Sequence, residues 1–230
     1  MTASPIDTRY DQQFAARKSL PWWPWVGCAF AESPVRTMIV GESIYMWSPE
    51  ARERYSRADG LRVTHTNHAM ALRRDSRYVR NIERALFACR KPSDRQKYGF
   101  WTNVAYHNLV LVPLSSRRRR PTQAEYQAGW RELFALCQLM EVKQCLVYGL
   151  EHSKLKALES AAEQSGHACV LRDAGTLGAR RATLQMGNAQ LELLFIRHPS
   201  AFFSWRQWAP LVRDNLALEF LPPGPEPSVG

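Results

Sequence analysis

Five short apolar runs, separated by stretches with helical periodicity, constrain the fold of this chain more than any other feature. They lie at 35–40, 102–112, 144–148, 168–172 and 191–196. Runs this short and this apolar are typical of strands that are buried on both faces. Buried strands that alternate with helices predict an α/β fold of three layers, in which helices flank a central, largely parallel β-sheet.

The stretches between and after these runs carry clear helix signals. Thr122 and Glu125 have the spacing of a capping box, and apolar residues follow them at helical intervals. A second helix is expected at 151–164, with Gly166 as its stop, and a third at 204–220.

The chain is long enough for a sizeable hydrophobic core. Of its 230 residues, 45% are apolar and 11% aromatic, which is sufficient for one compact domain. We place this domain at 1–221. Residues 222–230 include four prolines and two glycines and have little to bury, so we expect a disordered tail there. We expect the protein to be a monomer.

Positive charge is concentrated in one part of the chain. Lys and Arg number 31 against 21 Asp and Glu, a net charge of +10, which favours nucleic acid as the partner. The stretch 52–100 alone has 13 basic and 5 acidic residues. Within it, Arg77, Arg80 and Arg84 recur at helical spacing opposite Val79, Ile82 and Leu86. This pattern predicts an amphipathic helix whose basic stripe either contacts phosphates or is an ordinary solvated face.

Several protein classes are disfavoured. No run of about 18 apolar residues is present to span a membrane, and the first residues lack a secretory apolar region, so we expect a cytoplasmic protein without a membrane partner.

The five cysteines show no CxxC spacing, which disfavours a disulfide framework, a zinc ribbon and an iron–sulfur cluster. His65 and His68 lack a nearby acidic ligand, so they favour a surface or DNA contact over a metal site. We expect no metal and no cofactor.

Binding sites in such sheets lie beyond the carboxyl ends of the strands. This rule selects three loops, at 41–47, 108–121 and 198–205. They contain Glu42, Asn108 and His198, which together suit the cleavage of an N-glycosidic bond. An amide can pair with the edge of an extruded base, an imidazole can donate to the oxygen of the departing base, and a carboxylate can stabilise a cationic sugar or orient water.

Ordered motifs connect these loops to a known family. The sequence has GESIY at 41–45, YHNL at 106–109, PL at 113–114, RPT at 120–122 and HPS at 198–200. In this order they resemble the motifs of the uracil-DNA glycosylase superfamily, with parts similar to its single-strand-selective and thermophile-type branches. The resemblance covers roughly 34–216 and implies the α/β fold of that superfamily.

The resemblance implies a role for each candidate catalytic residue. Glu42 would activate water or stabilise the cation, Asn108 would read the base, and His198 would assist the leaving group. Asn103 competes with Asn108 for base reading, because Thr102-Asn103-Val104 also resembles a thermophile-type motif. The other expected members of the base pocket are Gly41, Ser43, Tyr45 and Tyr55, the last as the ring that stacks on the flipped base.

The resemblance also implies contacts to single- or double-stranded DNA. An apolar wedge follows the HPS motif in relatives, and Phe202 and Phe203 stand there in this chain, next to Ser200. The remaining candidate DNA contacts are the basic residues Arg77, Arg80, Arg84, Arg117, Arg118, Arg119 and Arg120.

The substrate implied by the resemblance is uracil or a modified pyrimidine. Ile44 and Tyr45 stand where relatives usually have proline and often glycine, which favours a modified base. If a virus supplies that modified base, the protein would serve in antiviral defence. None of the three loops contains a lysine, so we expect a monofunctional glycosylase that leaves an abasic site by hydrolysis. The alternative is an inactive nucleic-acid-binding protein on the same fold.

Overall fold

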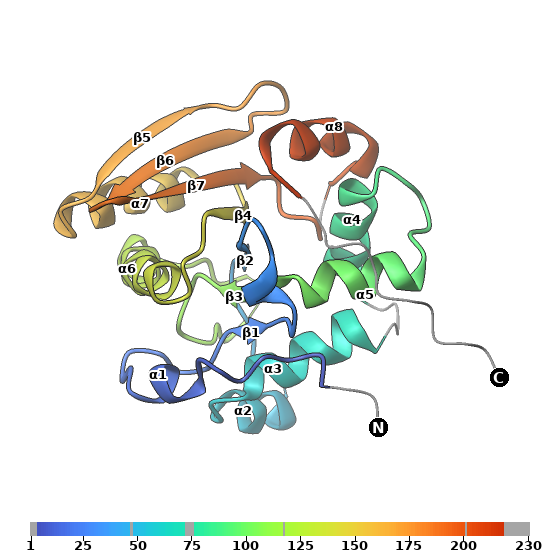
Figure 1. The fold of residues 1–230 in the computed structure, drawn as a ribbon. Coiled ribbons are helices and arrows are strands. Elements are labelled where there is room, and N and C mark those ends of the chain that lie inside the picture. The colour runs from blue at the N-terminus through green and yellow to red at the C-terminus, as the bar shows by residue number, and fades with distance from the viewer. Residues whose placement is uncertain (1–3, 47, 72–75, 117, 201, 219–230) are drawn as a thin grey trace.

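The computed structural model describes residues 4–46, 48–71, 76–116, 118–200 and 202–218, and its centre is a seven-stranded sheet (Figure 1). The spatial order of the strands is β1-β3-β2-β4-β7-β6-β5. Their bounds are β1 Trp25–Val26, β2 Thr37–Gly41, β3 Val104–Asn108, β4 Gln144–Tyr148, β5 Ala168–Asp173, β6 Arg180–Met186 and β7 Ala189–Ile196. The predicted α/β fold is therefore confirmed, but the sheet is mixed, with a mostly parallel core.

The centre of the sheet is parallel and its margins are antiparallel. β3, β2, β4 and β7 run in the same direction, so their carboxyl ends lie at one edge. β1 is antiparallel to β3, while β5, β6 and β7 form an antiparallel meander. The strand at 180–186 was not predicted, because it is half-exposed and alternates buried and exposed residues rather than forming an apolar run. Because β6 lies between β5 and β7, the predicted strand at 168–172 belongs to an antiparallel part of the sheet and not to its parallel centre.

The helices agree with the main sequence signals. Their bounds are α1 Asp11–Ala15, η1 Phe30–Glu32, α2 Pro49–Tyr55, α3 Gly60–His65, η2 Thr66–Met70, α4 Arg77–Leu86, α5 Asp94–Thr102, α6 Gln123–Leu139, α7 His152–Gln164 and α8 Trp205–Asn215. The predicted capping box at Thr122 and Glu125 opens α6, and α7 follows the predicted range within one residue. The expected helix at 204–220 is shorter, because the backbone becomes extended at Leu216.

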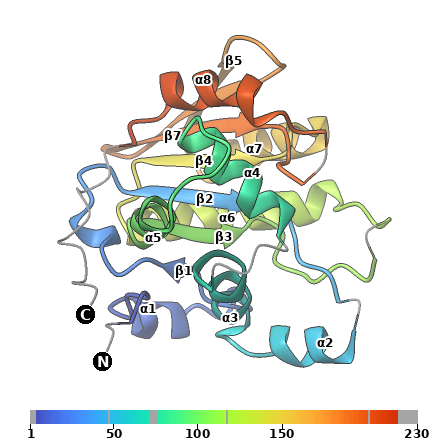
Figure 2. The ribbon, with the colours of Figure 1, turned by 90° about the vertical axis from the view of Figure 1, so that its right-hand side faces the viewer.

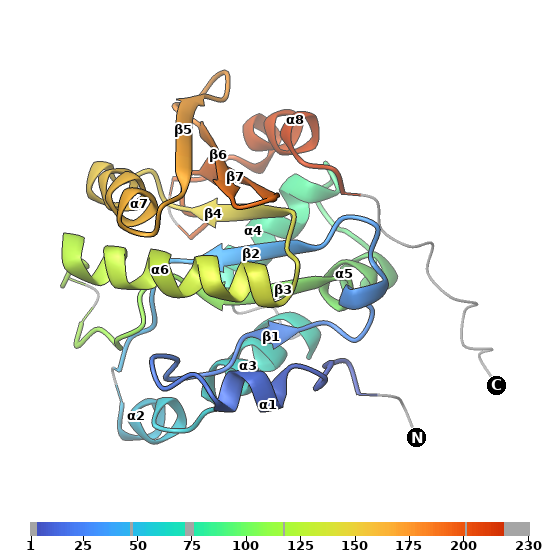
Figure 3. The same ribbon diagram turned by 60° about the vertical axis from the view of Figure 1, so that its left-hand side comes forward.

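Helices cover both faces of the sheet and create a core on each. α6 and α7 lie on one face, and α4, α5 and α8 lie on the other (Figure 3). Successive residues of β2 point to opposite cores, since Met38 and Val40 pack with α6 and α7 while Ile39 packs with the helices of the other face. This burial on both faces explains why β2 has no polar residue between Thr37 and Gly41.

The predicted basic helix is α4, and its apolar face is buried as expected. Val79, Ile82 and Leu86 are at most 6% exposed. In the part of the chain that the structure describes, no helix is both long and apolar enough to cross a membrane. The proposed domain limit at 221 and the tail at 222–230 lie outside the described residues.

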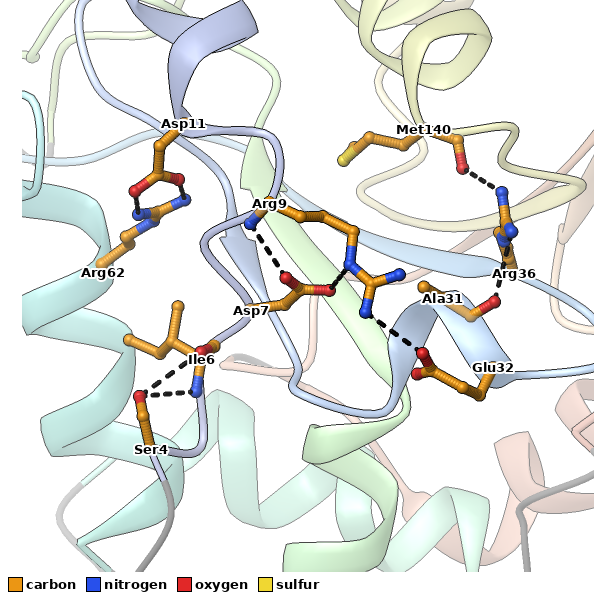
Figure 4. Close-up of polar contacts among 10 residues, drawn as sticks. All are labelled: Ser4, Ile6, Asp7, Arg9, Asp11, Ala31, Glu32, Arg36, Arg62 and Met140. Atoms are coloured by element: carbon orange, nitrogen blue, oxygen red, sulfur yellow. Dashed lines mark hydrogen bonds and ion pairs between the residues drawn. The ribbon is translucent and has the colours of Figure 1, made fainter.

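The N-terminal segment is attached to the rest of the fold by arginine contacts (Figure 4). Arg62 of α3 is buried and binds both carboxylate oxygens of Asp11, at 3.0 and 2.6 Å. Arg9 bridges Asp7 and Glu32, which connects the start of the chain to η1. These contacts make the segment 7–11 part of the folded structure.

Candidate active site

The segments that follow β2 and β3 remain paired beyond the sheet. The amide of Leu109 donates to the carbonyl of Gly41, and that of Val110 donates to the carbonyl of Glu42, both at 2.9 Å. Further along, Tyr45 forms a parallel bridge with Leu114. Figure 2 shows both segments leaving the sheet on the side toward which the arrow of β2 points. Glu42 and Asn108 therefore lie on neighbouring segments at the carboxyl edge, as predicted.

Asn108 is the last residue of β3 and lies opposite Gly41 in the register. The hydroxyl of Tyr106 donates to its Oδ1 at 3.1 Å. A Cβ at position 41 would lie 2.3 Å from Asn108 Oδ1 and 2.4 Å from Tyr106 Oη, so glycine is required at this close approach. Among the described residues, the hydrogen bond of the Asn108 side chain is the one accepted by Oδ1, and none is donated by Nδ2; the residue is 2% exposed. This nitrogen can therefore donate to an acceptor on a bound ligand.

Glu42 is buried and held by two donors from the helices of one face. The hydroxyl of Tyr126, on α6, donates to its Oε1 at 2.8 Å, and the Nζ of Lys154, on α7, lies 3.0 Å from the same oxygen. In the described part of the chain both contacts fall on Oε1. The second oxygen, Oε2, is left as an acceptor for another group.

These contacts determine the charge of Glu42. Burial alone raises the pKa of a carboxyl group, but the Lys154 ammonium and the Tyr126 hydroxyl outweigh that effect. The pKa of Glu42 is therefore below its ordinary value, and the side chain is a carboxylate at neutral pH.

His198 follows β7 and completes the group. The backbone amide of Ser200 donates to its Nδ1 at 3.2 Å, and Ser200 Oγ lies 2.8 Å from the same nitrogen. Because a backbone amide can only donate, Nδ1 is an acceptor and the proton of the neutral ring is on Nε2. Burial lowers the pKa of His198, with the Glu42 charge acting in the opposite direction. The ring is therefore neutral at pH 7 and can donate from Nε2.

The loop that carries His198 is anchored by α4. Asn81 Nδ2 donates to the carbonyl of Pro199 at 2.7 Å, and Arg77 donates to that of Ser200 at 3.4 Å. Ser200 and Arg77, both predicted as DNA contacts, thus also position the His198 ring.

The other expected pocket residues lie in different surroundings. Tyr55 packs edge-on against Trp22, with ring centroids 6.0 Å apart, and is partly buried. The Oγ of Ser43 is buried and has no partner among the described residues. Asn103 is the C-cap of α5 and donates to the carbonyl of Gly99. It precedes β3, so it lies at the amino end of that strand, and the structure does not bring it to the edge where Asn108 lies.

His65 is a residue whose position the sequence did not indicate. A surface or DNA contact was expected, but its side chain is fully buried. Its ring stacks on Tyr106 at 4.2 Å and lies edge-on against Trp25 and Trp101. Its role is to support the tyrosine that orients Asn108. Nowhere in the described residues do three His, Cys, Asp or Glu side chains gather in a way that could hold a metal ion.

The two phenylalanines after the HPS motif differ in exposure. Phe202 is 92% exposed and has a left-handed backbone, with φ of 50°. Phe203 instead stacks on Trp208 of α8, with ring centroids 5.7 Å apart. Of the two, Phe202 is therefore the ring that is exposed to solvent.

The candidate phosphate-binding arginines differ in exposure and in pairing. Arg118 and Arg120 are exposed, whereas Arg119 pairs with Glu125 at 2.5 Å. On α4, Arg84 donates to the carbonyl of Arg90, and Arg80 is partly buried. Arg117 lies outside the described residues.

Sequence reasoning missed Lys154, Tyr126 and Asn81. They come from helices, whereas the rule for such sheets points to the loops at the carboxyl ends of the strands. The signal available was the position of Lys154 in the first turns of α7, directly after β4, which lies between β2 and β7 in the sheet.

Comparison of the chain with protein-family models gives no match, and comparison with characterised protein sequences gives none either.

Proposed function

We propose that the protein is a DNA glycosylase that extrudes a pyrimidine from DNA and hydrolyses its N-glycosidic bond. The observation that carries this proposal is the arrangement of two groups at the same edge of the sheet: Glu42 is held as a carboxylate, and His198 is held as a neutral ring that can donate from Nε2. Glycosidic hydrolysis needs a negative charge near the sugar and a proton donor near the departing base.

Each residue has a distinct part in this reaction. Asn108 Nδ2 donates to a carbonyl oxygen of the extruded base and fixes its identity. Glu42 Oε2 stabilises the cationic sugar or orients the attacking water. His198 donates from Nε2 to the base oxygen that gains negative charge as the bond breaks. Phe202 occupies the space left in the duplex, and Arg118 and Arg120 bind the backbone.

The substrate is uracil or a modified pyrimidine. Ile44 and Tyr45 favour the second, because the chain after Glu42 continues in pairing with Leu114 and lacks the proline and glycine typical of uracil-specific relatives.

The test is base release from DNA oligonucleotides that carry uracil, other deaminated bases, or hydroxymethylated and glycosylated cytosines. Alkaline cleavage reports abasic sites. We expect one of these bases to be released by the wild type, and the variants Glu42→Gln, Asn108→Ala and His198→Ala to lose most turnover but keep DNA affinity.

Asn103→Ala is the matched control, because it removes the same side chain from the opposite end of β3 and should retain activity. Full activity of Asn108→Ala or His198→Ala would contradict the site. DNA binding without base release across the whole panel would instead establish a non-catalytic nucleic-acid-binding protein.

A further inference from the structure

Lys154 is the most completely enclosed charged side chain at the candidate site. It lies on α7, is 0% exposed, and comes to the site from outside the three loops that the sequence selected. Its ammonium has three acceptors: Glu42 Oε1 at 3.0 Å, Glu151 Oε2 at 2.7 Å and the carbonyl of Tyr148 at 2.6 Å. An ammonium group carries three protons, so each is used in one contact.

Gly149 provides the space for this arrangement. It follows β4 with φ of +100°, and a Cβ there would lie 2.1 Å from Lys154 Nζ and 2.3 Å from Glu151 Oε2. A side chain at position 149 would therefore occupy the place of the ion pair. The absence of a side chain in the turn after β4 therefore leaves room for the Lys154 ammonium group.

The full set of contacts defines what Lys154 can do. A lysine acts as a nucleophile only as a free amine, and this one is an ammonium bound to two carboxylates. Its charge instead compensates the burial of Glu42, which is 6% exposed. The other groups that face Glu42 are Tyr126 from α6, the His198 ring and, through Lys154, Glu151.

We propose that Lys154 is a positioning residue that keeps Glu42 ionised and fixes its Oε1, so that Oε2 is presented to the substrate. This inference rests on the proposed glycosylase function for its effect on rate. Its electrostatic part is independent of that function, because it concerns the protonation of Glu42 in the protein without DNA.

The first experiment measures the carboxyl titration of Glu42 by carbon-13 NMR, assigned with Glu42→Gln. We expect the pKa of Glu42 to be below its ordinary value in the wild type and to rise by at least about one unit in Lys154→Met. Lys156→Met is the control, since Lys156 is exposed on the same helix and its loss should leave the titration unchanged. An unchanged pKa in Lys154→Met would overturn the proposal.

The second experiment uses single-turnover base release as a function of pH. Lys154→Met should be slower than the wild type by about tenfold at pH 7, because Oε1 of Glu42 is no longer held in place. The acidic limb of its pH–rate profile should also move to higher pH, in step with the higher pKa of Glu42. When Glu42→Gln is already present, adding Lys154→Met should change the rate less than about twofold. A further large loss in the double variant, or a borohydride-trapped adduct on Lys154, would refute the positioning role.

These outcomes separate the two proposals. If the wild type releases no base, the glycosylase function fails while the NMR titration still decides the role of Lys154. If Lys154→Met does not fold, Gly149→Ala displaces the ammonium without removing its charge, and a smaller rise of the Glu42 pKa is expected. No rise in Gly149→Ala would then reject the inference.

Discussion

Asn81 of α4 donates a 2.7 Å hydrogen bond from Nδ2 to the carbonyl oxygen of Pro199. This bond joins the most basic part of the sequence to the loop that carries His198. It connects two segments more than a hundred residues apart, and it fixes the turn in which Ser200 donates to the His198 ring.

Asn81→Ala should therefore reduce base release although Asn81 touches no reacting group. We expect a loss of about tenfold, because a small displacement of a catalytic group is sufficient for an effect of this size. DNA affinity should be unchanged. The matched control is Asn215→Ala, which removes a similar 2.9 Å bond to the carbonyl of Leu211 within α8. Equal rates for wild type and Asn81→Ala would show that the anchor is dispensable.

Phe202→Ala should impair activity on duplex DNA but not on single strands. The side chain is 92% exposed, so its removal should leave thermal stability unchanged, while the duplex loses the group that fills the vacated space. Phe203→Ala should do the opposite and lower stability, because that ring stacks on Trp208. Base release from matched single- and double-stranded substrates, with melting curves, separates the two. Loss of activity on both substrates in Phe202→Ala would contradict the wedge role.

Arg118→Ser and Arg120→Ser should each weaken DNA binding in a salt-dependent way. Both residues are exposed, and removal of one phosphate-binding cation should lower the slope of log affinity against log salt by about 0.7 to 0.9. Arg119→Ser is the control, since that guanidinium already pairs with Glu125. The measurement is a binding titration at several salt concentrations. Slopes identical to that of the wild type would place the DNA elsewhere.

His107 should make the fold sensitive to acid. It is 1% exposed, and burial lowers its pKa from 6.5 to about 4, with Glu132 acting in the opposite direction. Between these two pH values the unfolded chain binds more protons than the folded one. The free energy of unfolding should therefore fall as pH decreases from 6.5 to 4, by about 3 kcal/mol for this group.

Urea denaturation at a series of pH values measures this slope. His65 is buried too and its pKa is lowered in the same direction, so it contributes to the same acid sensitivity. His107→Leu should therefore show a shallower slope rather than none. A slope unchanged from the wild type would mean that His107 does not titrate in this range.

The sequence predicted an element best where a single kind of interaction determines which residues that element contains. The apolar run at 144–148 and the capping box at Thr122 and Glu125 predicted β4 and the start of α6 correctly, because burial on two faces and a reciprocal cap each leave a local pattern. The half-exposed β6 leaves only a weak alternation. Its antiparallel pairing with β5 and β7 could not be read from the order of the elements.

The same distinction applies to the candidate site. Glu42, Asn108 and His198 were found because they follow strands whose carboxyl ends must meet. Lys154 was missed because its position in the first turns of α7 does not by itself show that its side chain turns inward toward β4. Such a contact depends on the packing of α7 on the sheet, which is a property of the whole fold.

The ion pair between Arg62 and Asp11 has a consequence for where this fold can be shortened. Arg62 also donates to the carbonyl of Pro24 at 2.8 Å and is only 6% exposed. Removal of α1 would leave a buried guanidinium without its carboxylate, which typically costs about 3 to 5 kcal/mol. A truncated protein that begins after α1 should thus be vulnerable to proteolysis first in α3, far in sequence from the cut.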